Sequence, residues 1–230
     1  MKKIFSIVMI MIAVVSPLRA EIETTVAADV VSEYIWRGAK CGDAAVQPTL
    51  GVSMAGIDLS CWGSVGVANF FDTREFDITL SYSIAGASVG VTDYWFSAGD
   101  EPYGRYFKYG KGATNHVFEA FAGYDLGFAS ISWYTNFAGA DYKADGSSAF
   151  SSYCELAAPF TFGGADWTAS LGFVPFESAL YGTEGFAVTN VSLSAAKSID
   201  ITESFSLPVS AGLTDNPCAE MAYLVFGISF

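Results

Sequence analysis

Positive charge is scarce in this 230-residue sequence, which holds 11 Lys and Arg against 24 Asp and Glu, with a single His. Three of the basic residues lie within the first twenty positions, where there is no acid. Residues 21–230 therefore carry eight basic and 24 acidic residues, a formal net charge of −16 (8 − 24). A chain with this balance does not bind nucleic acid by neutralising its phosphates.

Long apolar runs are also missing after the first twenty residues. Those twenty begin with two lysines, continue with an apolar run over 4–15, and end in a Pro-containing segment at 16–20. This is the layout of a secretory signal peptide cut before Glu21. An uncleaved anchor helix is the alternative, although a bilayer span needs about 20 apolar residues. We expect a signal peptide at 1–20 and one exported domain at 21–230.

Motifs for cofactor chemistry are absent too. The sequence shows no metal-ligand spacing, no phosphate-binding glycine loop and no nucleotide motif, so we expect no cofactor and no catalytic residue. A serine nucleophile would need a histidine base, and His116 is the one histidine. No particular Ser is paired with His116 by the sequence, so we expect a solvated loop residue rather than part of a lipid-modifying enzyme.

What the chain does have is a regular alternation of apolar and polar residues. In 76–84, Phe, Ile, Leu, Tyr and Ile fall on one face, and Asp, Thr, Ser and Ser fall on the other. This period indicates β-strands. Most runs have the ~9–11 residues of a tilted membrane-spanning strand. The twelve expected strands are about 25–36, 44–55, 57–67, 75–84, 87–97, 116–125, 128–138, 149–160, 165–175, 186–197, 203–213 and 220–230.

The connections between these strands alternate between short and long, the longest being 98–115. Short turns at one end and long loops at the other are typical of outer-membrane barrels. A soluble β-sandwich also alternates, but here the aromatic residues gather near strand ends, as in the aromatic girdles of a barrel. One band contains Trp36, Phe76, Trp95, Phe118 and Phe137, and the other contains Tyr124, Trp167, Phe205 and Phe230.

These patterns predict an all-β protein: an antiparallel, up-and-down transmembrane β-barrel of about twelve strands in a bacterial outer membrane, surrounded by lipid. The last residue is Phe230, with apolar residues at every second place before it. That ending resembles the insertion signal of bacterial outer-membrane proteins. We therefore expect the barrel assembly machinery to be a partner.

The polar face of the expected strands carries acids, which must point into the lumen because a charge facing lipid is costly. An acidic, water-filled lumen attracts cations. A plugged lumen, in which the acids pair with Arg37 and polar neighbours, is the alternative, and twelve strands are compatible with both. Asp93 is an exception that falls on the outward face. The expected pore-lining residues are Asp29, Glu33, Arg37, Asp58, Asp77, Glu119, Glu155 and Asp166.

Four cysteines in an exported chain can form disulfides. Cys41 and Cys218 fall in the first and last long loops, which barrel closure makes neighbours. We expect a disulfide between them, with free surface thiols as the alternative. Cys61 and Cys154 fall on the outward faces of separate strands and are expected to act as small apolar side chains.

Residues 31–38, Val-Ser-Glu-Tyr-Ile-Trp-Arg-Gly, resemble the opening motif of the TorF family of porins, a Val-Ser-Asp-Tyr-Val-aromatic-Arg-Gly type segment. Glu33 replaces the usual Asp, and the following segment 39–44 departs from the family pattern. The resemblance implies a porin with no assigned solute. Along an extended strand Glu33 and Arg37 would be about 13 Å apart, too far for an ion pair with each other. Each should pair with a charged residue on a neighbouring strand, and Glu119 or Asp77 is the expected partner of Arg37.

The leading hypothesis is passive diffusion of small hydrophilic solutes, with cations preferred. A structural or adhesive barrel that acts through loop 98–115 is the alternative from another class. That loop could bind a partner or the anionic sugars of the outer leaflet, or it could fold into the mouth of the pore. Its aromatic and basic residues are Tyr103, Arg105, Tyr106, Phe107, Lys108, Tyr109 and Lys111.

Overall fold

The structure is a computed structural model that describes residues 21–67, 74–97 and 105–230. The expected signal peptide and the first part of the 98–115 loop lie outside these residues. Within them, no helix is long and apolar enough to cross a membrane.

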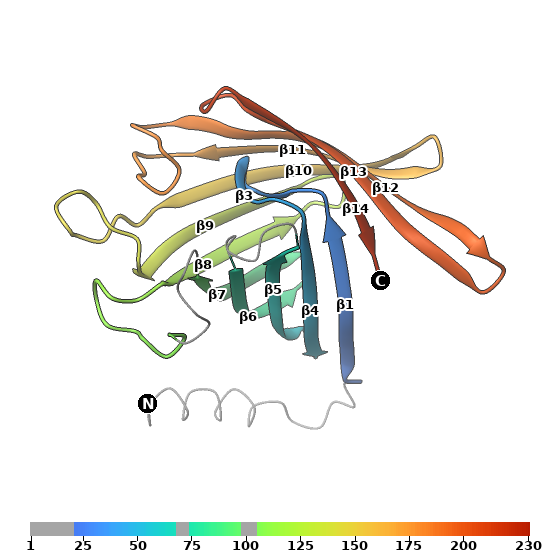
Figure 1. The fold of residues 1–230 in the computed structure, drawn as a ribbon, viewed down its shortest axis with the longest axis horizontal. Helices are drawn as coiled ribbons and strands as arrows, with labels where there is room; N and C mark the ends of the chain where they lie inside the picture. Colours follow the sequence, from blue (N-terminus) through green and yellow to red (C-terminus); the bar gives the residue numbers. More distant parts are fainter. Residues whose placement is uncertain (1–20, 68–73, 98–104) are drawn as a thin grey trace.

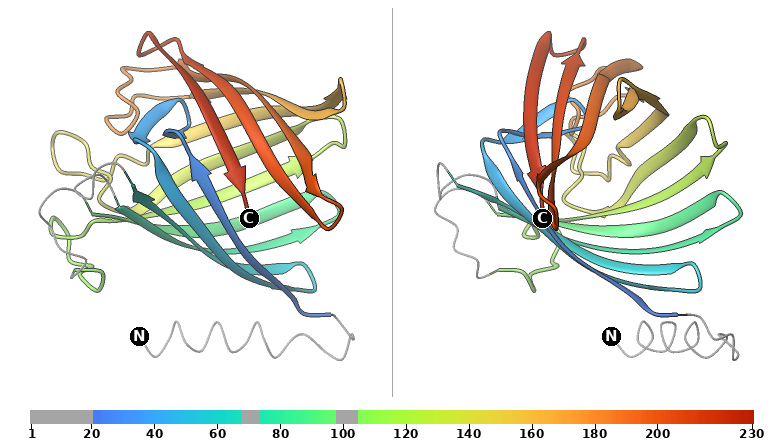
Figure 2. Two further views of the ribbon diagram at one scale, coloured as in Figure 1. Left: turned by 45° about the vertical axis from the view of Figure 1, so that its right-hand side comes forward. Right: turned by 90° about the vertical axis from the view of Figure 1, so that its right-hand side faces the viewer.

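Twelve antiparallel strands close into a barrel (Figures 1 and 2). Neighbours in the sequence are neighbours in the barrel, and β1 pairs with both β4 and β14, so the sheet has no open edge. The predicted all-β, up-and-down barrel is confirmed. Its strands are β1 (Glu23–Val31), β4 (Ala45–Met54), β5 (Ile57–Gly66), β6 (Arg74–Ile84), β7 (Ala87–Ser97), β8 (His116–Asp125), β9 (Ser130–Gly139), β10 (Ser152–Phe162), β11 (Ala165–Val174), β12 (Ala187–Thr202), β13 (Phe205–Asn216) and β14 (Met221–Ser229).

The two ends of the barrel differ, as the sequence predicts. At the turn end, two-residue connections join β4 to β5 and β6 to β7. Both residues of the first connection have positive φ, 53° at Ala55 and 83° at Gly56. This is the primed turn whose twist matches that of paired strands. At the loop end, the long segments 98–115, 140–151 and 175–186 join the strands.

Apolar residues cover the outside of the barrel and polar residues fill its inside, the reverse of their distribution in soluble proteins. Among the described residues, six apolar or sulfur-containing side chains are buried, against eighteen polar or charged ones. Large apolar side chains cover the outside, with Val26 80%, Leu50 58% and Leu224 58% exposed. A soluble protein rarely exposes so continuous an apolar surface. The alternation therefore places apolar residues outward and polar residues in the lumen.

The seam between the first and last strands uses the final residue of the chain. β1 and β14 pair through Asp29 to Val31, a shorter register than in the neighbouring pairs. Two further backbone hydrogen bonds join Ala28 and Phe230, at 3.1 and 2.9 Å. Phe230 thus takes part in closing the barrel.

The expected strand 25–36 is wrong in its second half. β1 ends at Val31, and the chain then forms a separate hairpin of β2 (Tyr34–Trp36) and β3 (Ala39–Gly42). Trp36 is therefore not part of the outward aromatic band, because its ring lies against Tyr94 and Tyr181 instead. The hairpin can leave the wall because β4 takes its place beside β1.

The turn at Ala55 provides a test of the fold. An L-residue other than Asn, Asp or Gly is disfavoured at positive φ, so Ala55→Asn should stabilise the folded barrel by about 0.5–1 kcal/mol. Urea unfolding of the detergent-folded protein measures this. The matched Gly56→Ala should destabilise it, since a Cβ there would lie 2.4 Å from the Ser83 carbonyl oxygen. A lower unfolding midpoint for Ala55→Asn would contradict the primed turn.

Candidate functional site

The β2–β3 hairpin lies inside the barrel. The ring of Tyr34 is 5.4 Å from that of Trp62 on β5, and the ring of Trp36 is 5.9 Å from that of Tyr94 on β7. Trp62 and Tyr94 belong to the inward face, as the alternation of their strands predicts. Figure 1 labels β3 near the loop end of the barrel. The hairpin therefore enters the lumen from the loop end.

A two-residue turn forms the tip of the hairpin. Arg37 has a φ of 49° and Gly38 a φ of 83°. Glycine is required at the second position, because a Cβ there would lie 1.7 Å from the carbonyl oxygen of Thr189 on β12. The Asn216 side chain on β13 donates a 3.0 Å hydrogen bond to the carbonyl of Gly38. The tip is thus fixed against β12 and β13.

Arg37 crosses the lumen to a carboxylate on β8. Its two terminal nitrogens donate to both oxygens of Glu119, at 2.6 and 2.8 Å. The pair is buried, with side-chain exposures of 7% for Arg37 and 1% for Glu119. Tyr94 donates a further 2.8 Å bond to Glu119. Of the two expected partners of Arg37, Glu119 and Asp77, the structure thus confirms Glu119.

Aromatic rings enclose the Arg37 guanidinium. Its central carbon lies 4.1 Å from the ring centre of Tyr134, 4.4 Å from that of Trp36 and 4.7 Å from that of Tyr153. Cation–π contacts with desolvated rings are each worth about 2 kcal/mol. The hydroxyl of Tyr181, from the 175–186 loop, accepts a 2.6 Å bond from Arg37. Burial raises the pKa of Tyr181 to about 12, so this contact is made by a neutral phenol.

The buried ion pair between Arg37 and Glu119 has a structural role. A bidentate pair with its remaining hydrogen-bonding groups satisfied is the geometry in which a buried ion pair is tolerated. Removing one partner leaves the other charged, buried and alone. Arg37 and Glu119 therefore hold the hairpin and leave little net charge for a passing ion.

Beside the hairpin, the lumen keeps a pocket of about 280 Å³. The hairpin's aromatic rings and the Arg37 side chain pack against β5 and β7 to β10, whereas the Gly38 tip meets β12 and β13. The pocket lies between the start of the hairpin and other positions of β12, β13 and β14. Residues Glu33 to Ile35 line one side, and small side chains such as Ser194 and Ser210 line the other. The structure thus places a plug in much of the lumen, and a pocket lined by both polar and apolar residues remains beside it.

Glu33 lies at this gap with a basic neighbour. The Lys40 ammonium is 2.9 Å from Glu33 and 2.7 Å from Asp43. Hydrogen bonds to Asp43 and Glu33 raise the pKa of Lys40 above its ordinary value. One lysine thus faces two carboxylates.

The other expected pore-lining residues are spread along the barrel. Asp77 is buried beside Glu75 and Tyr34. Glu155 accepts hydrogen bonds from Tyr153 and Asn190. Three more lie on inward positions of their strands. Asp29 accepts a 2.5 Å hydrogen bond from Ser229 at the seam. Asp58 is opposite Ser53 and Ser81, and Asp166 is exposed near the turn end.

Asp93, the outward exception, has a specific partner. Its carboxylate is 2.7 Å from Nδ1 of His116, and Nε2 of His116 faces the backbone carbonyl of Tyr106. His116 is fully buried, so the expectation of a solvated loop residue is wrong. The reason is that residues 105–115 fold over it.

The expected disulfide between Cys41 and Cys218 is not formed, and both are free thiols. The hairpin carries Cys41 into the lumen near Glu75, whereas Cys218 is exposed in the β13–β14 turn. Burial raises the pKa of the Cys41 thiol to about 12. Barrel closure brings the two loops together, but the hairpin removes Cys41 from the rim.

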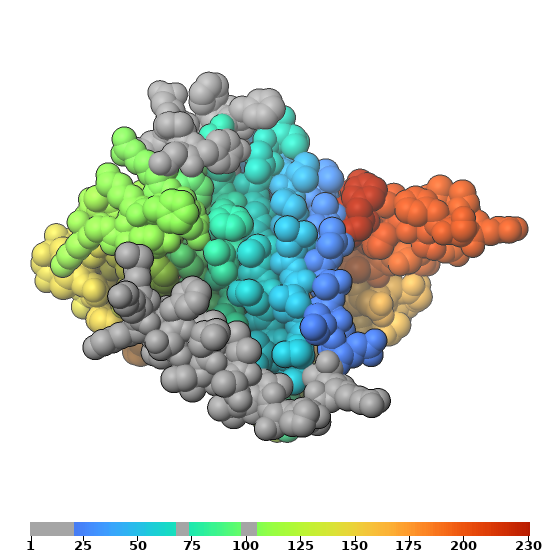
Figure 3. Space-filling model, turned by 90° about the horizontal axis from the view of Figure 1, so that it is seen from below, coloured from blue at the N-terminus to red at the C-terminus, as the bar shows by residue number. Residues whose placement is uncertain are grey.

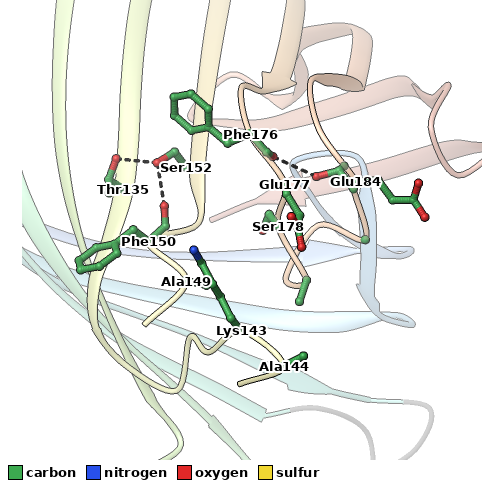
Figure 4. A pocket seen from close by; sticks show the side chains of 13 residues that line it. Thr135, Lys143, Ala144, Ala149, Phe150, Ser152, Phe176, Glu177, Ser178 and Glu184 are labelled. Carbon is green, nitrogen blue, oxygen red and sulfur yellow. Dashed lines mark hydrogen bonds between the residues drawn. The ribbon is translucent and has the colours of Figure 1, made fainter. Parts of the chain in front are cut away.

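A larger pocket of about 530 Å³ lies at the rim of the loop end (Figure 4). Lys143 on one side and Glu177 and Glu184 on the other take part in its lining. Thr135 and Ser152, which are bonded to each other, bring the outward face of β9 and β10 into it. Since this pocket opens at the outer rim, the gap beside the hairpin is the better candidate for a path through the barrel.

Sequence reasoning missed the hairpin and the contribution of Tyr181. The signal for the hairpin was Gly38, because glycine readily adopts the positive φ that the second position of a two-residue turn requires. No signal marked Tyr181, which reaches Arg37 across 144 residues. Neither a protein-family model nor a curated protein matches the chain.

The buried pair predicts an unequal effect of single and double substitutions. Arg37→Met should destabilise the folded protein by about 3–5 kcal/mol, since it leaves Glu119 buried and unpaired. Adding Glu119→Gln should recover much of this loss. Urea unfolding measures both, and proteolysis near Lys40 reports release of the hairpin. Equal or additive losses in the single and double variants would contradict a buried, mutually dependent pair.

Proposed function

We propose that this protein is an outer-membrane channel for passive diffusion of small hydrophilic solutes, with a preference for cations. The observation that carries the proposal is the gap beside the hairpin, which Glu33 lines together with Gln47, Ser194 and Ser210. The plug makes the gap narrow, so large solutes are excluded.

The outer surface supports a membrane location. In lipid every backbone donor and acceptor in the sheet needs a partner, and a closed barrel supplies one. The wall of this barrel is closed and apolar outside. Aromatic residues such as Phe76, Phe137 and Phe160 are exposed toward the ends of their strands, which fits the two interfaces of a bilayer. Lipid and, during insertion, the barrel assembly machinery are the partners that this location implies.

The placement of the charges supports cation preference by a different route from the one that the sequence suggested. Arg37 and Glu119 neutralise each other, so they do not select ions. Glu33 lines the gap and shares Lys40 with Asp43, and a carboxylate in a narrow aqueous path favours cations. Residues 31–38, which resemble the opening of TorF porins, supply both the plug and this carboxylate.

Enzymatic activity is not part of the proposal. Both ring nitrogens of His116 are engaged, by Asp93 and by the Tyr106 carbonyl. A histidine that serves as a general base needs one nitrogen directed at the nucleophile. This arrangement supports a structural role for His116.

Glu33→Gln should lower the cation-to-anion permeability ratio roughly tenfold, because one charge about 6 Å from an ion in water stabilises a cation and destabilises an anion by ~0.7 kcal/mol each. Reversal potentials of the refolded mature chain in a planar bilayer under a salt gradient measure it. The matched control is Asp200→Asn, an exposed acid near the turn end that accepts a bond from Ser206; it should leave the ratio unchanged. A folded wild-type barrel without conductance would instead favour a structural or adhesive barrel.

Membrane location makes its own prediction. Val91 is outward near the middle of β7 and 43% exposed, so Val91→Arg should destabilise the lipid-embedded barrel by about 2–4 kcal/mol. Urea-dependent unfolding in lipid vesicles measures it, with Val91→Ala separating loss of the side chain from gain of charge. No difference between the two variants would contradict a lipid-facing Val91.

A further inference from the structure

The described part of the β7–β8 loop, residues 105–115, lies on the outside of the barrel. The ring of Tyr106 is 5.6 Å from Phe76, 5.7 Å from Trp95 and 4.9 Å from His116. All three belong to the outward face of β6, β7 and β8. Figure 3 shows this side of the molecule, with the light green residues beside the wall of the barrel. These residues therefore do not fold into the mouth, one of the two possibilities that the sequence left open.

The His116 pair attaches the loop at this position. Asp93 holds Nδ1 at 2.7 Å, and Nε2 meets the backbone of Tyr106. The ring of Tyr109 stacks on His116 with 4.4 Å between centres. Trp95 beneath the loop is only 4% exposed. Residues of this loop thus cover the polar Asp93 and His116 pair on an apolar wall.

The loop presents positive charge and apolar rings together. Arg105, Lys108 and Lys111 are exposed, and residues 105–115 contain no acid. Three of the eight basic residues of the mature chain lie within seven positions of a strongly acidic protein. Phe107 is 87% exposed beside them, and Tyr109 is 50% exposed.

A polar pocket of about 270 Å³ lies within the same segment. Arg105 and Lys108 line it together with residues 112–115. In the same segment, the rings of Tyr106 and Tyr109 lie near outward aromatic side chains at the loop end of the barrel, where the headgroups of the outer leaflet would be. A phosphate group has the charge and the hydrogen-bond acceptors that such a pocket recognises.

We propose that residues 105–115 bind the phosphate of an outer-leaflet lipid headgroup, with Arg105 and Lys108 at the phosphate and Phe107 in the interfacial part of the lipid. This rests on the proposed membrane location and not on channel activity. A lipid is favoured over free phosphate because the exposed Phe107 ring adjoins the basic residues. An aromatic side chain at that depth is stabilised by the interface.

The experiment uses the full mature chain folded in an uncharged detergent, with calorimetric titration of three probes. They are a lysophospholipid with a phosphomonoester headgroup, its phosphocholine counterpart, and inorganic phosphate. Wild type should bind the first at least about 10-fold more tightly than the other two. Arg105→Gln with Lys108→Gln should weaken that binding roughly 10- to 100-fold. Phe107→Ser should weaken binding of the lipid and leave binding of inorganic phosphate unchanged.

The matched control removes two basic residues from elsewhere, Lys143→Gln with Lys197→Gln, and should bind like wild type. Equal affinity for the two lysolipids, or an equal loss in the control, would overturn the proposal. Equal affinity for lipid and inorganic phosphate would show a soluble-anion site and overturn the lipid assignment. Lys108→Gln alone covers the case in which the double variant fails to fold. Conductance of the same variants, expected to be unchanged, separates this result from the channel proposal.

Discussion

The buried pair of Arg37 and Glu119 determines how the interior of this barrel is divided. An arginine and a carboxylate lose solvation when they leave water, and bidentate geometry with full hydrogen bonding compensates that loss. Here Tyr94 and Tyr181 complete the hydrogen bonds, and three aromatic rings enclose the guanidinium. Because the pair joins the tip of a hairpin from β1 to β8 across the lumen, it makes a segment of the first loop into a plug.

The remaining features of the interior follow from this crossing. The hairpin covers the wall of β5 to β10, and Tyr34 lies against Trp62 and near the buried Glu75 and Asp77. The opposite wall, with Ser194 and Ser210, keeps the gap. Small side chains on that wall therefore leave the space that larger ones would fill. The same loop movement explains why Cys41 does not meet Cys218.

The outer surface is governed by a different requirement, since polar groups there must be covered or lie at an interface. Asp93 and His116 meet this requirement by pairing with each other under residues 105–115. The loop that covers them brings Lys108 and Phe107 to the level of the outward aromatic band. Covering a polar pair on an apolar wall thus produces a basic and aromatic surface beside the outward aromatic band.

The sequence by itself determined the barrel. A period of two fixes which residues share a face, and alternating connection lengths fix the direction of each strand. Ten of the twelve strands were found within three residues of their observed ends, whereas the expected strands 25–36 and 186–197 each differ by five residues at one end. The sequence also indicated that Arg37 needs a distant acid, because Glu33 is too far along an extended chain. Only the tertiary structure decided that residues 34–42 leave the wall, that Tyr181 joins Arg37, and that the later part of loop 98–115 folds outward. These contacts join residues 10 to 144 positions apart and depend on closure of the barrel, which periodicity along one strand cannot express.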